Sequence, residues 1–192
     1  MIPITQALQF LIIVIANLYI FVLLLRVVLQ FLDVSPYDPI SQAVISLTHH
    51  PLRPLNKIIP RIMGVDTPAV LLIIILEMTK LILLILLYGL FPPNFVGLLV
   101  WALGNLLSRI LNLYFYVIIF RVVLSWLRSP KLVNIVYFLD RLTEPLLSPI
   151  RRVTPFFIGM DLSPIFAIII LQLSSILFIA PLVQLGKAMT LG

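Results

Sequence analysis

Hydrophobic residues gather in four long stretches, separated by segments in which proline and charged residues are common. The stretches cover about residues 4–32, 68–90, 95–127 and 163–185. Each holds at least the ~20 apolar residues that an α-helix needs to cross a bilayer core of ~30 Å. Polar segments at 33–67 and 128–162 link the first stretch to the second and the third to the fourth. This pattern predicts an all-α membrane protein with four transmembrane helices arranged as two hairpins.

Composition excludes an ordinary soluble protein. Of the 192 residues, 62% are hydrophobic and 10% are charged, whereas soluble domains carry roughly 25% charged residues. The chain has no cysteine, which excludes thiol catalysis, disulfides and cysteine-ligated metals. The net charge is +6. Because the cations lie mostly in the polar segments beside the spans, they favour contact with anionic lipid rather than binding of nucleic acid.

The two halves of the chain are an internal duplication. "RVVL" occurs at residues 26–29 and again at 121–124, and at this offset 21 of 60 positions are identical between 17–76 and 112–171. We therefore divide the chain into a first repeat at 1–94 and a second at 95–192. Each repeat contains two spans, so both repeats enter the membrane in the same orientation. Parallel repeats disfavour an inverted-repeat transporter.

Each polar segment is predicted to be an amphipathic, proline-rich interfacial loop. A short amphipathic stretch begins each loop, at residues 38–48 and around 137–139. The prolines that follow should prevent a long helix, because proline lacks an amide hydrogen and restricts the residue before it. They are Pro51, Pro54 and Pro60 in the first loop and Pro145, Pro149 and Pro155 in the second. Such loops suit the headgroup boundary, with apolar side chains dipped and cations on phosphate or in water.

The distribution of cations predicts the topology. The first loop holds three of them and the second holds five, whereas the turn at 91–94 and the N-terminus hold none. By the positive-inside rule, both loops are cytoplasmic and both termini are outside. The candidate contacts with lipid or a protein partner are Lys57, Arg61, Arg141, Arg151 and Arg152.

Charged residues within the spans need a reason, since insertion at the centre of a span costs about 3 kcal/mol. Glu77 and Lys80 lie three residues apart on one helical face. They form either a self-paired ion couple or a polar patch on an ion path. Arg26 and Arg121 are retained in both repeats. From similar depths along the helices, we expect Arg26 to bond Glu77.

For Arg121 we expect a contact with Gln172 or a loop carbonyl. The alternative for both arginines is that they reach the interface and bind lipid phosphate. Asn17 and Asn112 are expected to form hydrogen bonds between helices.

Asp66 and Asp161 each precede a span that starts with proline, so helix capping explains them better than metal binding. His49, His50 and Asp38 form only a weak divalent-ion pattern, because nothing fixes their geometry. The sequence shows no phosphate-binding glycine loop, nucleophile–base arrangement or dinucleotide fingerprint. We therefore expect no enzyme activity, no cofactor and no resident metal.

Two motifs of the second repeat stand out, "RVVLSWL" at 121–127 and "LTEPLLSPIRRVTPFFIGMDLSP" at 142–164, with looser counterparts at 26–32 and 47–68. In these motifs the chain resembles the YGGT family of small bacterial and plastid membrane proteins. It implies a multi-pass protein of the bacterial inner membrane and offers no catalytic residue. Family associations with osmotic and ion stress, with nucleoid or division organisation and with cytochrome b6 maturation give no agreed activity.

Two functions remain open from the sequence. The first is an assembly or scaffold factor that docks anionic lipid, a membrane protein or a second copy of itself through its two basic loops. The alternative is ion transport or ion-stress homeostasis, with a pore formed between protomers of an oligomer. Four spans with few embedded charges make a poor channel in one chain, which favours the scaffold.

Overall fold

The computed structural model describes residues 2–32, 34, 37, 39–60, 64–90, 94–127, 132–154 and 161–192. Over these ranges the regular elements are helices, which confirms the all-α prediction. The chain forms two compact units, residues 1–107 with 180–192 and residues 108–179, and each is described by itself.

Within the described ranges, four helices are long and apolar enough to cross a membrane. They are α1 (Ile2–Phe31), α3 (Thr67–Leu87), α4 (Phe95–Leu127) and a continuous run of α6 (Ser163–Ser174), η2 (Ser175–Ile179) and α7 (Ala180–Leu191). The four predicted spans are thus confirmed, and the last one extends beyond its predicted end at residue 185. Its middle turn, η2, is π-helical. Pro181 is the second residue after that turn and donates no amide hydrogen, a frequent cause of such a local change in helix geometry.

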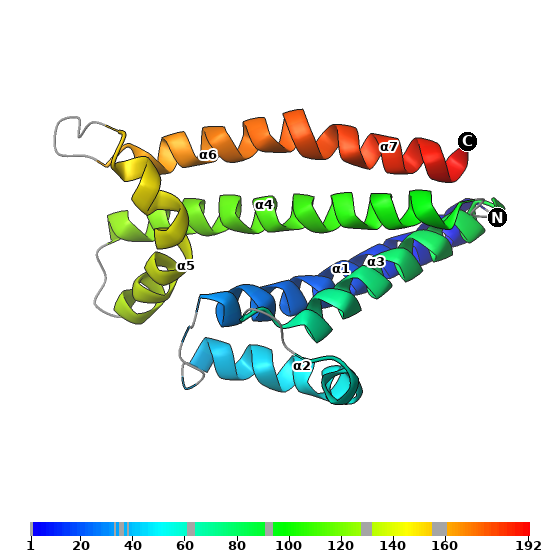
Figure 1. Cartoon of the computed structure of the whole chain (residues 1–192), viewed down its shortest axis with the longest axis horizontal. Helices are drawn as coiled ribbons and strands as arrows, with labels where there is room; N and C mark the ends of the chain where they lie inside the picture. The colour runs from blue at the N-terminus through cyan, green and yellow to red at the C-terminus, as the bar shows by residue number, and fades with distance from the viewer. Residues whose placement is uncertain are drawn as a thin grey trace. The chain divides into compact units, whose positions relative to one another are not determined.

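The two polar segments contain long helices, so the prediction that their prolines prevent them is wrong. The helix α2 covers Pro39–Ile58 with Pro51 and Pro54 inside it, and α5 covers Val133–Arg151 with Pro145 and Pro149 inside it. Figure 1 shows both helices changing direction along their length.

The carbonyls left without a helical donor explain how these prolines are tolerated. They belong to the residues four positions earlier, Leu47, His50, Arg141 and Pro145, and all four residues are exposed. Water can satisfy carbonyls at such positions, so each proline costs less than the ~3 kcal/mol of a buried helix interior. The amphipathic character that the sequence indicated is retained over the whole of each helix.

The first unit is built on α1 lying along α3, with α2 packed against both (Figure 1). Leu81 and Ile85 of α3 also form a buried cluster with Leu98 and Ala102 of α4. In the same unit, α7 approaches α4 closely. A Cβ atom built on Gly186 would lie 2.6 Å from Trp101 Cα, so only glycine lets these backbones meet, as small residues do between membrane helices.

The second unit gathers its core where three helices meet. Ile118 of α4, Leu147 of α5 and Ala167 and Leu171 of α6 are buried together. Consequently α5 is attached to the spans by its apolar face, and its polar face is left at the surface. The charged residues of the second repeat lie on α4 and α5 and just before α6.

Candidate functional site

A buried polar cluster joins the three helices of the first repeat. Arg26 Nε donates to Asp66 Oδ2 at 2.9 Å, and Arg26 Nη1 donates to Thr48 Oγ1 at 2.8 Å. Arg26 is 7% exposed, and Thr48 and Asp66 are fully buried. Because Arg26 lies in α1, Thr48 in α2 and Asp66 just before α3, the cluster fastens the amphipathic helix to both spans.

This cluster corrects two predictions. Arg26 does not bond Glu77, and its burial leaves no place for the predicted alternative of lipid phosphate. Asp66 occupies the cap position of α3, but its side chain makes no cap hydrogen bond. An unpaired buried charge costs about 3–5 kcal/mol, whereas a helix cap contributes typically ~1 kcal/mol. Pairing with Arg26 is therefore the larger energetic contribution of the Asp66 carboxylate.

A second buried group lies within the spans of the same repeat. Lys80 Nζ lies 2.5 Å from Glu77 Oε2 and donates to Asn17 Oδ1 at 3.3 Å. The predicted pairing of Glu77 with Lys80 is therefore present, as is the expected contact between helices at Asn17. Asn112 instead bonds Ser108, one turn earlier in its own helix.

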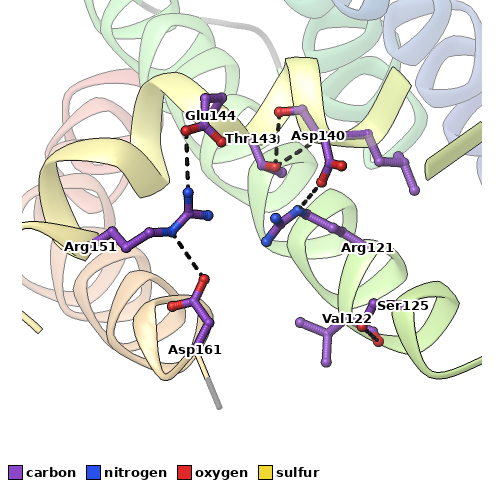
Figure 2. A network of polar contacts seen from close by, with 9 residues as sticks. Arg121, Val122, Ser125, Asp140, Thr143, Glu144, Arg151 and Asp161 are labelled. Carbon is purple, nitrogen blue, oxygen red and sulfur yellow. Dashed lines mark hydrogen bonds and ion pairs between the residues drawn. The ribbon is translucent and has the colours of Figure 1, made fainter. Parts of the chain in front are cut away.

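The second repeat arranges its charges as an open network (Figure 2). Arg121 Nε contacts Asp140 Oδ1, so the predicted contact with Gln172 or a loop carbonyl is wrong. Arg151 Nε donates to Asp161 Oδ2 at 3.0 Å, and its Nη1 donates to Glu144 Oε1 at 3.3 Å. The arginine side chains are 19% and 29% exposed, so this network is partly solvated.

Asp161 has two roles. Its Oδ1 accepts the Ser163 amide hydrogen at 2.9 Å just before α6, although the cap position of α6 is Leu162 and not Asp161 as predicted. Partial burial raises the pKa of Asp161, but the hydrogen bonds from Ser163 and the charge and hydrogen bond of Arg151 outweigh it. The pKa of Asp161 is therefore lowered from its ordinary value.

The remaining predicted contact residues differ in their surroundings. Lys57 and Arg152 are exposed at the ends of α2 and α5, and Arg61 lies outside the described residues. Arg141 stacks on the Tyr137 ring at 5.7 Å and donates from Nε to its hydroxyl at 3.3 Å.

The weak divalent-ion pattern of the first loop is not gathered into a ligand group within the described ranges. His49 and His50 are exposed in α2, and Asp38 lies outside the described residues. No group of three potential ligands from histidine, aspartate and glutamate occurs in the described ranges.

Sequence reasoning missed four participants. Thr48 and Thr143 are identical across the repeats, and that identity was the available signal. Asp140 and Glu144 gave a different signal, since they are acids on the polar face of a helix whose counterpart, α2, contains no acidic residue.

A groove of ≈ 390 Å³ lies between α1 and α3 beside Lys80. Its walls are mostly aliphatic, including Leu8, Leu11, Ile12 and Leu83. The groove therefore offers an ion few oxygen ligands.

Comparison with known proteins shows which family the chain belongs to. The chain is 33% identical over 164 residues to an uncharacterized protein of Pseudomonas aeruginosa, covering 85% of this chain and 83% of the relative. It is 35% identical over 171 residues to the uncharacterized protein YggT of Escherichia coli K12, covering 86% of each. It is 40% identical over 157 residues to an uncharacterized protein of Haemophilus influenzae, covering 82% of this chain and 83% of the relative.

No solved structure is significantly similar to the chain. The model of the CCB3/YggT family matches it twice, at residues 5–87 and 100–182. These two matches coincide with the two hairpins and confirm the duplication seen in the sequence. The chain belongs to the CCB3/YggT family of membrane proteins.

Proposed function

We propose that this protein is a non-enzymatic assembly or scaffold factor of the bacterial inner membrane, which docks anionic lipid and membrane protein partners through α2 and α5. The observation that carries the proposal is the exposed face of α2. It presents His49, His50, Arg53 and Lys57, all exposed, in a helix without an acidic residue. A cationic face on an amphipathic helix beside two spans is suited to the phosphate layer of a membrane.

The buried cluster supports this role because it holds α2 in place. Arg26 and Asp66 fix Thr48 on the inner face of the helix, so the opposite face is presented at a constant position next to the spans. The positive-inside rule favours the cytoplasmic side for both helices.

A lipid-binding measurement tests the proposal. The protein is placed in nanodiscs with equal phosphatidylcholine and phosphatidylglycerol, and native mass spectrometry reads the lipids it retains. Each cation near an anionic surface contributes about 1 kcal/mol, so Arg53→Gln and Lys57→Gln should each lower retention of the anionic lipid about fivefold. The control variant Lys187→Gln removes a cation of α7 that stacks on Trp101 of α4. This variant should retain the wild-type preference for the anionic lipid. Equal retention of both lipids by the wild-type protein contradicts the proposal.

Ion transport is the second candidate, favoured by the buried Glu77 and Lys80 and the half-buried Asn17 inside the spans. Their mutual pairing and the aliphatic groove beside them support a structural role instead. In liposomes with a potassium-sensitive dye, the scaffold proposal expects no protein-dependent flux. A flux that Glu77→Gln or Arg121→Ala abolishes would reverse the ranking of the two candidates.

A further inference from the structure

The second repeat contains the same three residue types as the buried cluster but pairs them differently. Arg121, Thr143 and Asp161 are the counterparts of Arg26, Thr48 and Asp66 at the same sequence offset. In the first repeat the arginine binds the aspartate and the threonine. In the second, Arg121 contacts Asp140, and Asp161 binds Arg151.

Charges present only in α5 account for this difference. Asp140, Glu144 and Arg151 stand where the first repeat has Ile45, His49 and Asn56. Asp140 therefore competes for Arg121, and Arg151 competes for Asp161. The first repeat has no such competitors, so its arginine and aspartate find each other.

The second repeat is nevertheless arranged for the pairing seen in the first. Thr143 donates its hydroxyl hydrogen to the Leu139 carbonyl at 2.9 Å, as Thr48 donates to the Val44 carbonyl at 2.7 Å. Its oxygen is thus set to accept an arginine N–H as Thr48 does. Among the described residues, Arg121 uses only Nε, which leaves Nη1 and Nη2 available. Figure 2 shows the Arg121 and Arg151 side chains pointing toward each other, with Asp161 beside them.

The present pairing is weak enough to be exchanged. Partly exposed ion pairs contribute little to stability, and the side chains of Asp140 and Asp161 are 42% and 33% exposed. Water can take over either carboxylate. One new anion on Arg151 is therefore sufficient to release Asp161.

We propose that Arg151 and Arg152 bind the phosphate of an anionic lipid headgroup, and that this binding transfers Asp161 from Arg151 to Arg121. The inference rests on the lipid docking proposed above and adds its consequence. The phosphate takes the place of Asp161 on Arg151, and the exposed Arg152 next to it adds a second donor. Asp161 keeps its hydrogen bond from the Ser163 amide through Oδ1, because only Oδ2 changes partner. The second repeat then holds the closed cluster of the first.

A distance measurement across the second unit tests the exchange. The chain has no cysteine, so Phe120→Cys in α4 and Ile165→Cys in α6, both at exposed positions, accept spin labels without background. Pulsed electron paramagnetic resonance compares nanodiscs of phosphatidylcholine with nanodiscs that contain phosphatidylglycerol. A second, shorter distance should be populated in the anionic lipid, because Asp161 draws the start of α6 toward Arg121.

Variants separate the steps. Arg151→Asn, which copies the first repeat, should show the shorter distance in both lipids because Asp161 is already released. Asp161→Asn should show the longer distance in both, and Arg152→Gln should weaken the response to anionic lipid. The control Arg141→Gln removes a cation of the same helix that is engaged by Tyr137, and it should respond like the wild-type protein.

Each contrary outcome points to one failure. A longer distance for Arg151→Asn in both lipids overturns the exchange of partners. Retention of anionic lipid without any change of distance overturns the exchange and leaves the proposed lipid docking intact. Absence of anionic-lipid retention overturns both. A shift produced by inorganic phosphate in phosphatidylcholine nanodiscs overturns the assignment of the phosphate to a lipid.

Discussion

Replacing Asp66 by asparagine tests whether the buried cluster holds the first repeat together. The substitution keeps the shape of the side chain but removes the charge opposite Arg26, whose partners are Asp66 and Thr48. Breaking a buried pair by removing one partner costs 3–5 kcal/mol. Asparagine can still accept one hydrogen bond from Arg26, so we expect the lower end of that range, about 3 kcal/mol.

The duplication supplies a matched control. Asp161→Asn changes the corresponding residue of the second repeat, where the side chains of the pair are 29% and 33% exposed. Ion pairs of that kind contribute about 0–1 kcal/mol. The two variants should therefore differ by about 2 kcal/mol or more, although they alter the same residue type at the same place in each repeat.

A double variant separates loss of the pair from loss of packing. Arg26→Met with Asp66→Leu removes both charges and fills similar volume, and replacement of a buried ion pair by apolar residues is often neutral or stabilising. It should be more stable than Asp66→Asn alone.

The assay is unfolding by sodium dodecyl sulfate in mixed micelles, followed by circular dichroism of the helices. Equal destabilisation by Asp66→Asn and Asp161→Asn would refute the contrast between a buried cluster and an open network. A double variant less stable than Asp66→Asn would show that the cost does not arise from an unpaired charge.

Three further predictions concern other parts of the chain. Gly186→Leu should destabilise the protein by about 1–3 kcal/mol through overpacking against Trp101, whereas Ala188→Leu at an exposed position of α7 should change the unfolding midpoint little. The lowered pKa of Asp161 contributes stability above the ordinary value of 3.8, and this is lost as the pH falls through the lower folded-state pKa. Acid titration of the unfolding midpoint should therefore show a decline that Asp161→Asn removes. Pro149→Ala should stabilise α5 by less than ~3 kcal/mol and increase its helicity, because the new amide can donate to the exposed Pro145 carbonyl.

The spans could be predicted from the sequence because their signal is local. An uninterrupted apolar run of the required length leaves an α-helix as the structure that satisfies its own backbone in lipid. The duplication was equally accessible, since Arg26, Thr48 and Asp66 recur at one offset. The residues of the buried cluster could therefore be identified from the sequence, whereas their pairing could not.

The predicted partner of Arg26 was wrong because counting residues along a helix gives the depth of a side chain and not its direction around the helix axis. Glu77 and Asp66 both offered a carboxylate to Arg26, and the depth argument favoured Glu77. The structure shows that Glu77 is already held by Lys80 on the same helix, whereas Asp66 at the start of α3 faces Arg26. The prediction that prolines prevent long helices was wrong for another reason. The energetic cost of a proline inside a helix depends on whether the freed carbonyl is exposed to water, and this exposure is set by the tertiary packing of α2 and α5.

The pairing of Arg26 with Asp66 also sets an order of events during synthesis. The two residues are 40 positions apart, and at about 5–20 residues per second the ribosome needs roughly 2–8 s to make the intervening chain. During that interval α1 is already long enough to enter the membrane. Because Asp66 has not yet been synthesised, the Arg26 side chain is expected to extend toward the membrane interface. The buried cluster can therefore form, and the first hairpin can close, only after Asp66 has been synthesised.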